Sequence, residues 1–148
     1  MNIVNKKVFH EYEILEKFEA GIQLLGSEVK SIRGGRMMLN GSFVRILGDE
    51  AYLVNAEIPL YPYARPDGYE SKRSRKLLLH AKELLQLKGK VTQSNLTIVP
   101  LSCYTSKNFI KLQIGLARGK KEHQKREDLK KQAINRDIEQ TLRGKIEY

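Results

Sequence analysis

The sequence is poor in cysteine, tryptophan and long apolar runs. Cys103 is the only cysteine among 148 residues, which excludes an intramolecular disulfide and fits a reducing compartment. Because Cys103 stands in a strand-like run between Leu101 and Tyr104, we expect a buried, inert thiol rather than a nucleophile. No apolar run approaches the roughly 20 residues of a membrane-spanning helix, and residues 1–9 lack the apolar stretch of a signal peptide. We therefore expect a soluble, cytoplasmic protein.

Clusters of metal-ligating or catalytic side chains are also lacking. His10, His80 and His123 are far apart, and none has a second ligand three or four residues away, so a zinc site is not expected. The run from Gly115 to Lys121 superficially resembles a phosphate-binding loop. It has the wrong glycine spacing, and Lys121 stands where a hydroxyl would hold magnesium. We therefore expect no metal and no cofactor, and an enzyme stays possible only if its catalytic groups are dispersed along the sequence.

Acidic residues are outnumbered, because 27 Lys and Arg face 17 Asp and Glu, for a formal charge of +10. Such an excess predicts a polyanionic partner, which is RNA, DNA or an acidic membrane face. The length favours one domain with a tail. Because apolar content falls after Arg118, we place a domain at residues 1–118 and a basic tail at residues 119–148. A thin apolar stripe predicts a tail that is disordered or partly helical when free and orders on a partner.

Short alternating segments dominate residues 1–118 and predict an antiparallel sheet. The expected elements are a strand Tyr12–Leu25 bulged at Gly21, a hairpin of Phe43–Leu47 and Ala51–Val54, a loop Ile58–Ser74, a helix Ala81–Lys88 stopped by Gly89, and strands Leu96–Tyr104 and Phe109–Ala117. Many strands with few helices indicate a small closed or partly closed barrel, and an oligonucleotide-binding barrel is compatible with this order.

One short helix is predicted between Gly26 and Arg33. Ser27 is expected to be its N-cap. Val29 and Ile32 share a face that can be buried, whereas Lys30 and Arg33 share an exposed face. Glu28 has two possible roles. It is either a first-turn acid favoured by the helix dipole or an acceptor for a base amino group.

Basic clusters are the remaining functional candidates, because together they could neutralise phosphates. They stand beside the proline- and tyrosine-rich loop, on the short helix, after the last strand and in the tail: Lys30, Arg33, Arg73, Arg75, Lys76, Lys120, Lys121, Lys125, Arg126, Lys130 and Lys131. Tyr61, Tyr63 and Tyr69 either stack on unpaired bases or anchor the loop, and the sequence leaves both roles open.

Four separated motifs remain, and they are Gly26-Ser27-Glu28-Val29-Lys30-Ser31-Ile32-Arg33-x-Gly35, Ser42-Phe43-Val44, Arg75-Lys76-Leu77-Leu78-Leu79-His80, and Ala117-Arg118-Gly119-Lys120-Lys121-x-His123-x-Lys125-Arg126. They stand in the order seen in the small protein B family, the SsrA-binding proteins of bacterial trans-translation, and the chain resembles that family over roughly Asn5 to Lys131.

The resemblance implies a mainly β protein with some α structure, built as an oligonucleotide-binding-like antiparallel barrel with peripheral helices. It implies a monomeric adaptor, not an enzyme, that binds the tRNA-like domain of transfer-messenger RNA and brings it to stalled ribosomes. The body would replace the missing anticodon arm, and the tail would enter the empty messenger channel.

Matched to the family motifs, the candidate residues fall into three groups. RNA binding is implied for Glu28, Lys30, Arg33, Arg75, Lys76, Leu78, Lys120 and Lys121; the ribosomal decoding centre for His10; and the messenger channel for the tail residues Lys125, Arg126, Lys130 and Lys131. Gln124 replaces the aspartate of the family's Asp-Lys-Arg motif, which removes one charge from the implied tail contact.

Two other functions fit the basic composition. A generic barrel-type RNA-binding or ribosomal protein would bind unrelated structured RNAs with similar affinity. An RNA-processing enzyme would turn over RNA, and the absence of a ligand cluster argues against it.

Overall fold

A computed structural model describes the chain except for residues 1, 95, 121–125, 127–129, 131–132 and 134–148. The strands are β1 (Asn2–Val4), β2 (Tyr12–Ile22), β3 (Phe43–Leu47), β4 (Glu50–Val54), β5 (Arg75–Leu78), β6 (Thr97–Ser106) and β7 (Phe109–Gly119). The helices among them are α1 (Lys6–Glu11), α2 (Gly26–Arg33) and α3 (Ala81–Ser94).

The strands form one antiparallel sheet that closes on itself. Its order is β1-β6-β3-β4-β5-β2-β7, and an additional pairing joins the last strand of this row, β7, back to β6. Six strands therefore make a ring, and β1 pairs with β6 beside it. Gly115 lets the wall close tightly, because a Cβ there would lie 3.0 Å from Ile14 Cγ2 and 3.1 Å from Leu101 Cδ1. The predicted mainly β antiparallel fold is confirmed.

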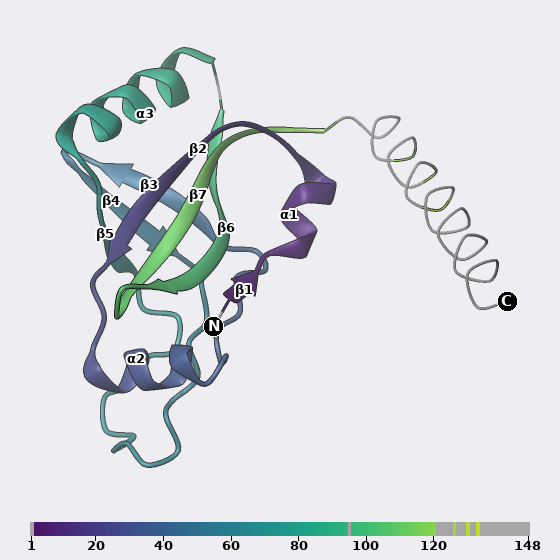
Figure 1. Ribbon diagram of the computed structural model, residues 1–148. Coiled ribbons are helices and arrows are strands. Elements are labelled where there is room, and N and C mark those ends of the chain that lie inside the picture. The colour runs from purple at the N-terminus through teal and green to yellow at the C-terminus, as the bar shows by residue number, and fades with distance from the viewer. Residues whose placement is uncertain (1, 95, 121–125, 127–129, 131–132, 134–148) are drawn as a thin grey trace, which may run out of the picture.

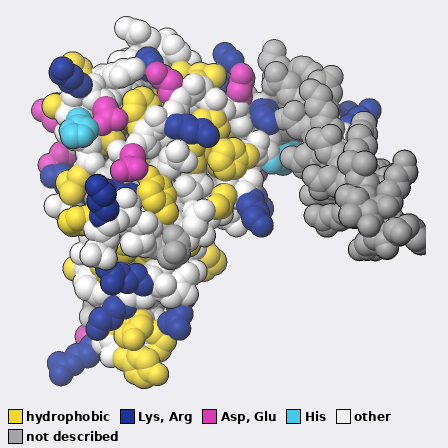
Figure 2. Space-filling view, in the orientation of Figure 1, with side chains coloured by type: hydrophobic (Ala, Val, Ile, Leu, Met, Phe, Trp, Pro, Cys, Tyr) yellow, Lys and Arg dark blue, Asp and Glu magenta, His cyan; other side chains and the backbone are white. Residues whose placement is uncertain are grey.

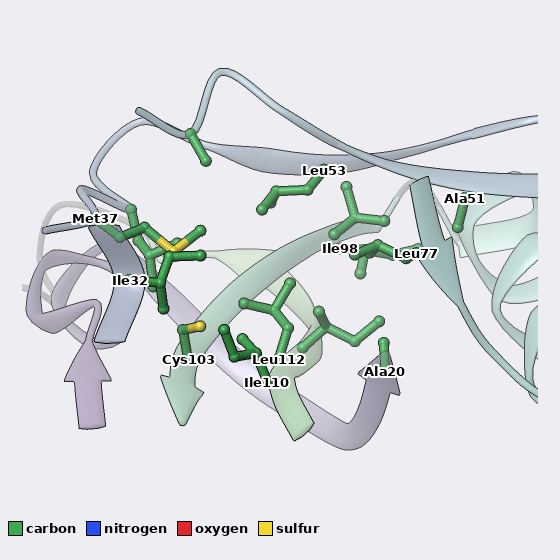
Figure 3. Close-up of a cluster of buried hydrophobic side chains, with 14 of the residues drawn as sticks. Ala20, Ile32, Met37, Ala51, Leu53, Leu77, Ile98, Cys103, Ile110 and Leu112 are labelled. Atoms are coloured by element: carbon green, nitrogen blue, oxygen red, sulfur yellow. The ribbon is translucent and has the colours of Figure 1, made fainter. Parts of the chain in front are cut away.

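Two helices lie at opposite ends of the sheet, with α3 above it and α2 below it (Figure 1). Ile32 of α2 and Leu87 of α3 are both 0% exposed and belong to the same apolar core. Side chains from the strands fill the space between them, including Leu53, Ile98 and Leu112 (Figure 3). Burial of this core fixes both helices against the sheet.

Cys103 lies in this core and is 0% exposed. Burial raises the pKa of its thiol to about 12, so the thiolate is not populated near neutral pH. The expectation of a buried cysteine is confirmed. Among the described helices, none combines the length and apolar character required to cross a membrane.

Both predicted hairpins are present. Positive φ values at Lys107 (48°) and Asn108 (70°) form the tight turn between β6 and β7, where a hairpin loop of two residues demands such backbone. Pro100 stands inside β6 beside a register irregularity between Pro100 and Ser102. A proline, which donates no ladder hydrogen bond, is tolerated at such a position.

Three details of the expected elements are wrong. The helix predicted to stop at Gly89 continues to Ser94, since packing of Leu87 and its neighbours outweighs the cost of one helical glycine, about 1 kcal/mol. The irregularity in β2 lies between Ile14 and Glu16 rather than at Gly21. The strand itself ends at Ile22 rather than at Leu25.

The tail follows the end of β7 at Gly119. Arg126 and Lys130 are helical and exposed. The predictions for Lys121, Lys125 and Lys131 concern residues outside those that the structure describes.

Candidate nucleic-acid interface

Helix α2 begins at Gly26, with Leu25 as its N-cap residue. The predicted cap by Ser27 is wrong, because its side chain makes no cap hydrogen bond. Glu28 reaches back instead, and its Oε1 accepts a hydrogen bond of 2.9 Å from the Leu25 N–H. A glutamate at this helical position commonly satisfies a backbone donor in this way. The helix is therefore fixed at its start by the one acidic residue that it carries.

Glu28 is also the centre of a buried ion-pair network. Its Oε2 accepts hydrogen bonds from Arg75 Nε (2.9 Å) and Arg75 Nη2 (2.5 Å). Its Oε1 lies 2.6 Å from Arg73 Nη2. The side chains of Glu28 and Arg75 are both 0% exposed. Neither carboxylate oxygen faces solvent in this structure, so the base contact inferred for Glu28 has no accessible acceptor here.

The same network fixes the long loop, residues 55–74, which joins β4 to β5. Arg75 donates from Nη1 to the Ala56 carbonyl (2.8 Å) and from Nη2 to the Ser71 carbonyl (3.0 Å). The hydroxyl of Ser31, on α2, donates to the Pro59 carbonyl at 2.6 Å. We call α2 together with the long loop the α2 lobe. Hydrogen bonds to buried side chains give this irregular loop a defined shape.

The ionisation of Glu28 makes the α2 lobe sensitive to acid. Burial opposes ionisation, but the Leu25 N–H and the guanidinium groups of Arg75 and Arg73 outweigh it and lower the pKa of Glu28. A folded-state pKa below the unfolded value gives stability that is present above the unfolded pKa and lost as pH falls through the folded pKa.

A Glu28→Gln variant is expected to be less stable than the wild type at pH 7, with a difference that shrinks below about pH 4.3, the ordinary pKa of glutamate. The reason is that below this pH Glu28 of the unfolded chain binds a proton, whereas folded Glu28 stays ionised until the pH reaches its lower folded pKa, so the stability that ionised Glu28 gives the wild type is lost over this range. Urea unfolding of both proteins between pH 7 and pH 3 measures this difference. A difference that stays constant across that range would contradict the ionisation of Glu28 in the folded protein.

The two cations predicted on the outer face of α2 are indeed exposed. Lys30 Nζ lies 5.5 Å from the centre of the Tyr61 ring, and Arg33 Nη2 donates to the Asn108 carbonyl at 3.3 Å. Neither of the two forms an ion pair within the part of the chain that the structure describes. Their positive charge is therefore available to a phosphate.

Strand β5 sends its residues to two sides. Arg75 and Leu77 point inward and are buried, whereas Leu78 is 51% exposed. Leu78 and Lys111 line one surface hollow of about 560 Å³. Lys76 pairs with Glu50 at 3.0 Å, and this contact raises the pKa of Lys76. Arg75 thus belongs to the interior of the α2 lobe, while Leu78 can meet a partner directly.

Lys120 and His10 lie elsewhere, at the far end of β7. The Lys120 backbone N–H donates to the Glu11 carbonyl at 2.9 Å, and its Nζ donates to the Phe9 carbonyl at 3.1 Å. Asn108, beside α2, and Lys120 bracket the eleven residues of β7, which places them on the order of 30 Å apart. The structure therefore separates the candidate residues into the α2 lobe and the region around α1.

Sequence reasoning missed α1, β1, β5 and the pairing of Glu28 with Arg73 and Arg75. Arg73 and Arg75 alternate around Ser74, so both point to one side of an extended chain. That spacing was a usable signal for a shared carboxylate. Nothing local in the sequence identified Glu28 as that carboxylate, because it is 47 residues from Arg75.

Basic and apolar side chains occur together on the visible face of the molecule. Lys and Arg surround a group of hydrophobic side chains at its lower end, where Figure 1 places α2 and the long loop (Figure 2). Within the described residues, no group of three or more histidine, cysteine or acidic side chains is arranged to hold a metal ion. Exposed basic side chains beside apolar ones are typical of a surface that binds a polyanion.

The chain is similar to known proteins over nearly its whole length. The family model described as "SmpB protein" matches residues 2–144. An SsrA-binding protein of Sulfurihydrogenibium sp. is 51% identical over 142 residues, covering 96% of this chain and 93% of that protein. An SsrA-binding protein of Carboxydothermus hydrogenoformans is 48% identical over 141 residues, covering 95% of each.

A solved structure supports the same relationship. It is described as "tmRNA-SmpB: a journey to the center of the bacterial ribosome", is 47% identical, and matches with a TM-score of 0.68. The match covers 82% of this chain and 85% of that one. With a family model spanning nearly the whole sequence and relatives near half identity over more than nine-tenths of it, the chain belongs to the SmpB protein family.

Proposed function

We propose that this chain is an RNA-binding adaptor of trans-translation, which binds the tRNA-like domain of transfer-messenger RNA and delivers it to stalled ribosomes. The observation that carries this function is the near-full-length match to SsrA-binding proteins. The likeness to an SmpB structure described with tmRNA and the ribosome supports the same partners. The formal charge of +10 suits a protein that meets RNA on more than one side.

The α2 lobe is the proposed grip on the tRNA-like domain. Lys30 and Arg33 offer exposed charge to phosphates, and Leu78 offers an exposed apolar side chain on neighbouring β5. Glu28 and Arg75 act as positioning residues, because they lie inside the lobe and fix its shape. Lys76 and, at the far end of β7, Lys120 add further basic contacts, and Lys121, which lies outside the described residues, is proposed as another from the family motif.

The region around α1 and the tail are the proposed contacts with the ribosome. His10 would face the decoding centre from α1. The tail would carry Lys125, Arg126, Lys130 and Lys131 into the messenger channel. A messenger in that channel would exclude the tail, so binding of the tail would report a vacant channel. In this role the chain acts as a monomer in the bacterial cytoplasm, where ribosomes work, and catalyses no reaction itself.

Binding measurements separate this function from generic RNA binding. The wild-type chain is expected to bind the tRNA-like domain of transfer-messenger RNA on the order of a hundredfold more tightly than a structured RNA of equal length. Both affinities should fall with salt, because each phosphate contact releases counterions. Filter binding at several salt concentrations measures both.

Two outcomes would redirect the assignment. Similar affinity for the two RNAs would favour a generic barrel-type RNA-binding protein. Turnover of labelled RNA by the purified chain would favour a processing enzyme.

A further inference from the structure

Two tyrosines form an aromatic pair in the long loop. The ring centres of Tyr61 and Tyr63 are 5.5 Å apart, and the rings meet edge to face at 63°. Pro62 stands between them and restricts the backbone. The edge-to-face contact is a favourable arrangement of two aromatic rings. The geometry therefore holds Tyr63 in a defined orientation rather than leaving it on a free loop.

Helix α2 supports this pair from the other side. Lys30 Nζ lies 5.5 Å from the Tyr61 ring centre, within the range of a cation–π contact. The Ser31 hydroxyl donates to the Pro59 carbonyl, two residues before Tyr61, at 2.6 Å. A cation and a hydrogen bond from one helix thus hold the loop just where the aromatic pair begins.

Exposure distinguishes Tyr63 from the other tyrosines of the loop. Tyr69 is half-buried, and its hydroxyl donates to the Ile58 carbonyl at 2.5 Å. Tyr61 is half-buried between Tyr63 and Lys30. Tyr63 is 88% exposed, more than any other large hydrophobic side chain among the described exposed ones. Tyr69 and Tyr61 therefore anchor the loop, and Tyr63 presents its ring to solvent.

We propose that Tyr63 is a stacking platform for one unpaired nucleobase of the bound RNA, held in place by Tyr61, whose own ring contacts Lys30. An aromatic ring fixed beside a cation matches a nucleotide, which carries a flat base beside a phosphate. The nearby Lys30 offers charge to the phosphate while the ring of Tyr63 offers its face to the base. This inference rests on the proposed RNA-binding function and deepens it.

Affinity measurements with matched variants test the platform. Tyr63→Ala is expected to weaken binding of the tRNA-like domain by about fivefold or more, the range found for loss of one base–aromatic stack. Tyr63→Phe keeps the ring and should bind as the wild type does. Leu85→Ala removes another exposed apolar side chain, 73% exposed on α3, and should also bind normally.

Salt dependence distinguishes stacking from charge. Tyr63→Ala should leave the slope of log affinity against log salt unchanged, because no phosphate contact is lost. Lys30→Ala should reduce that slope by roughly 0.7 to 0.9, the value of one phosphate contact. A slope that changes in Tyr63→Ala would contradict stacking as the cause of its weaker binding.

A fluorescent variant reports the contact directly. The chain contains no tryptophan, so Tyr63→Trp introduces a single tryptophan at the platform. Its fluorescence should be quenched by the tRNA-like domain, at the RNA concentrations that produce binding in the filter assay. A fully paired RNA duplex of equal charge should leave it unchanged.

Two results would contradict the stacking role of Tyr63 and leave the proposed adaptor function standing. They are wild-type affinity in Tyr63→Ala and unquenched tryptophan in a fully bound Tyr63→Trp complex. Failure of the wild-type chain to prefer the tRNA-like domain would count against the proposed function itself, so the two failures can be distinguished.

Discussion

A Glu28→Ala variant is expected to lose on the order of 3–5 kcal/mol of unfolding free energy, the cost of breaking a buried ion pair by removing one partner. The alanine would leave Arg75 charged, buried and without its carboxylate. It would also leave the Leu25 N–H without its acceptor at the start of α2. Urea unfolding measures the loss, which is large compared with the stability of an ordinary domain.

The Glu28→Ala variant should also bind RNA more weakly, and the loss of affinity should differ between specific and non-specific RNA. Binding of the tRNA-like domain depends on the shape of the α2 lobe, whereas non-specific binding depends mainly on charge. Glu28→Ala should therefore weaken the specific complex far more than a non-specific one. Equal weakening of both would remove Glu28 from any role in recognition.

A matched variant compares the stability that this buried pair provides with the stability that an exposed pair provides. Glu13 pairs with Arg118 at 3.0 Å, with side chains 48% and 60% exposed. Exposed pairs contribute about 1 kcal/mol or less, so Glu13→Ala should unfold nearly as the wild type does. If both variants lose the same stability, burial of the Glu28–Arg75 pair is not what makes it important.

Removal of the tail has the second large expected effect. A chain ending at Lys120 should bind the tRNA-like domain within a few-fold of the full chain, yet support no tagging of incomplete proteins on stalled ribosomes. The reason is that we propose the α2 lobe as the contact with the RNA and the tail as the part that senses the empty messenger channel. RNA binding and a reconstituted tagging reaction measure the two effects.

The position of the cut matters. Lys120 contacts the carbonyls of Glu11 and Phe9 through its N–H and Nζ, so a chain ending at Arg118 would also lose an anchor of α1. Tagging that persists in the chain ending at Lys120 would refute the tail model. Loss of RNA binding in it would show that the tail also grips the RNA.

The sequence was sufficient to predict the sheet, because its signals are local. Alternation from Ile110 to Leu116 indicates a strand with one buried face, and β7 has that face. The turn at Gly48 and Asp49 could be predicted in the same way, and β3 and β4 pair on either side of it. The two shortest strands, β1 and β5, were not predicted. They have three and four residues, which is too few to show the two-residue alternation of a strand.

The interior of the α2 lobe was beyond local reasoning. From the sequence, Glu28 was an acid among cations that could either favour the helix dipole or accept a hydrogen bond from a base, and neither role involved Arg75. Only the tertiary fold brings Arg75 to it across 47 residues and removes both from solvent. The same holds for the tyrosines of the long loop. The sequence left stacking and anchoring both open for them, whereas burial and hydrogen bonding in the fold distinguish Tyr69 from Tyr63.

Glu28 lies inside the α2 lobe, and we propose that it stays there when RNA is bound. The most direct test follows the Arg75 Nε–H, which donates to Glu28 at 2.9 Å, by NMR in the free chain and in the complex with the tRNA-like domain. A positioning role predicts a slowly exchanging Nε–H signal that persists in both states. Loss of that protection on RNA binding would mean that the carboxylate leaves Arg75 for the RNA, and would contradict it.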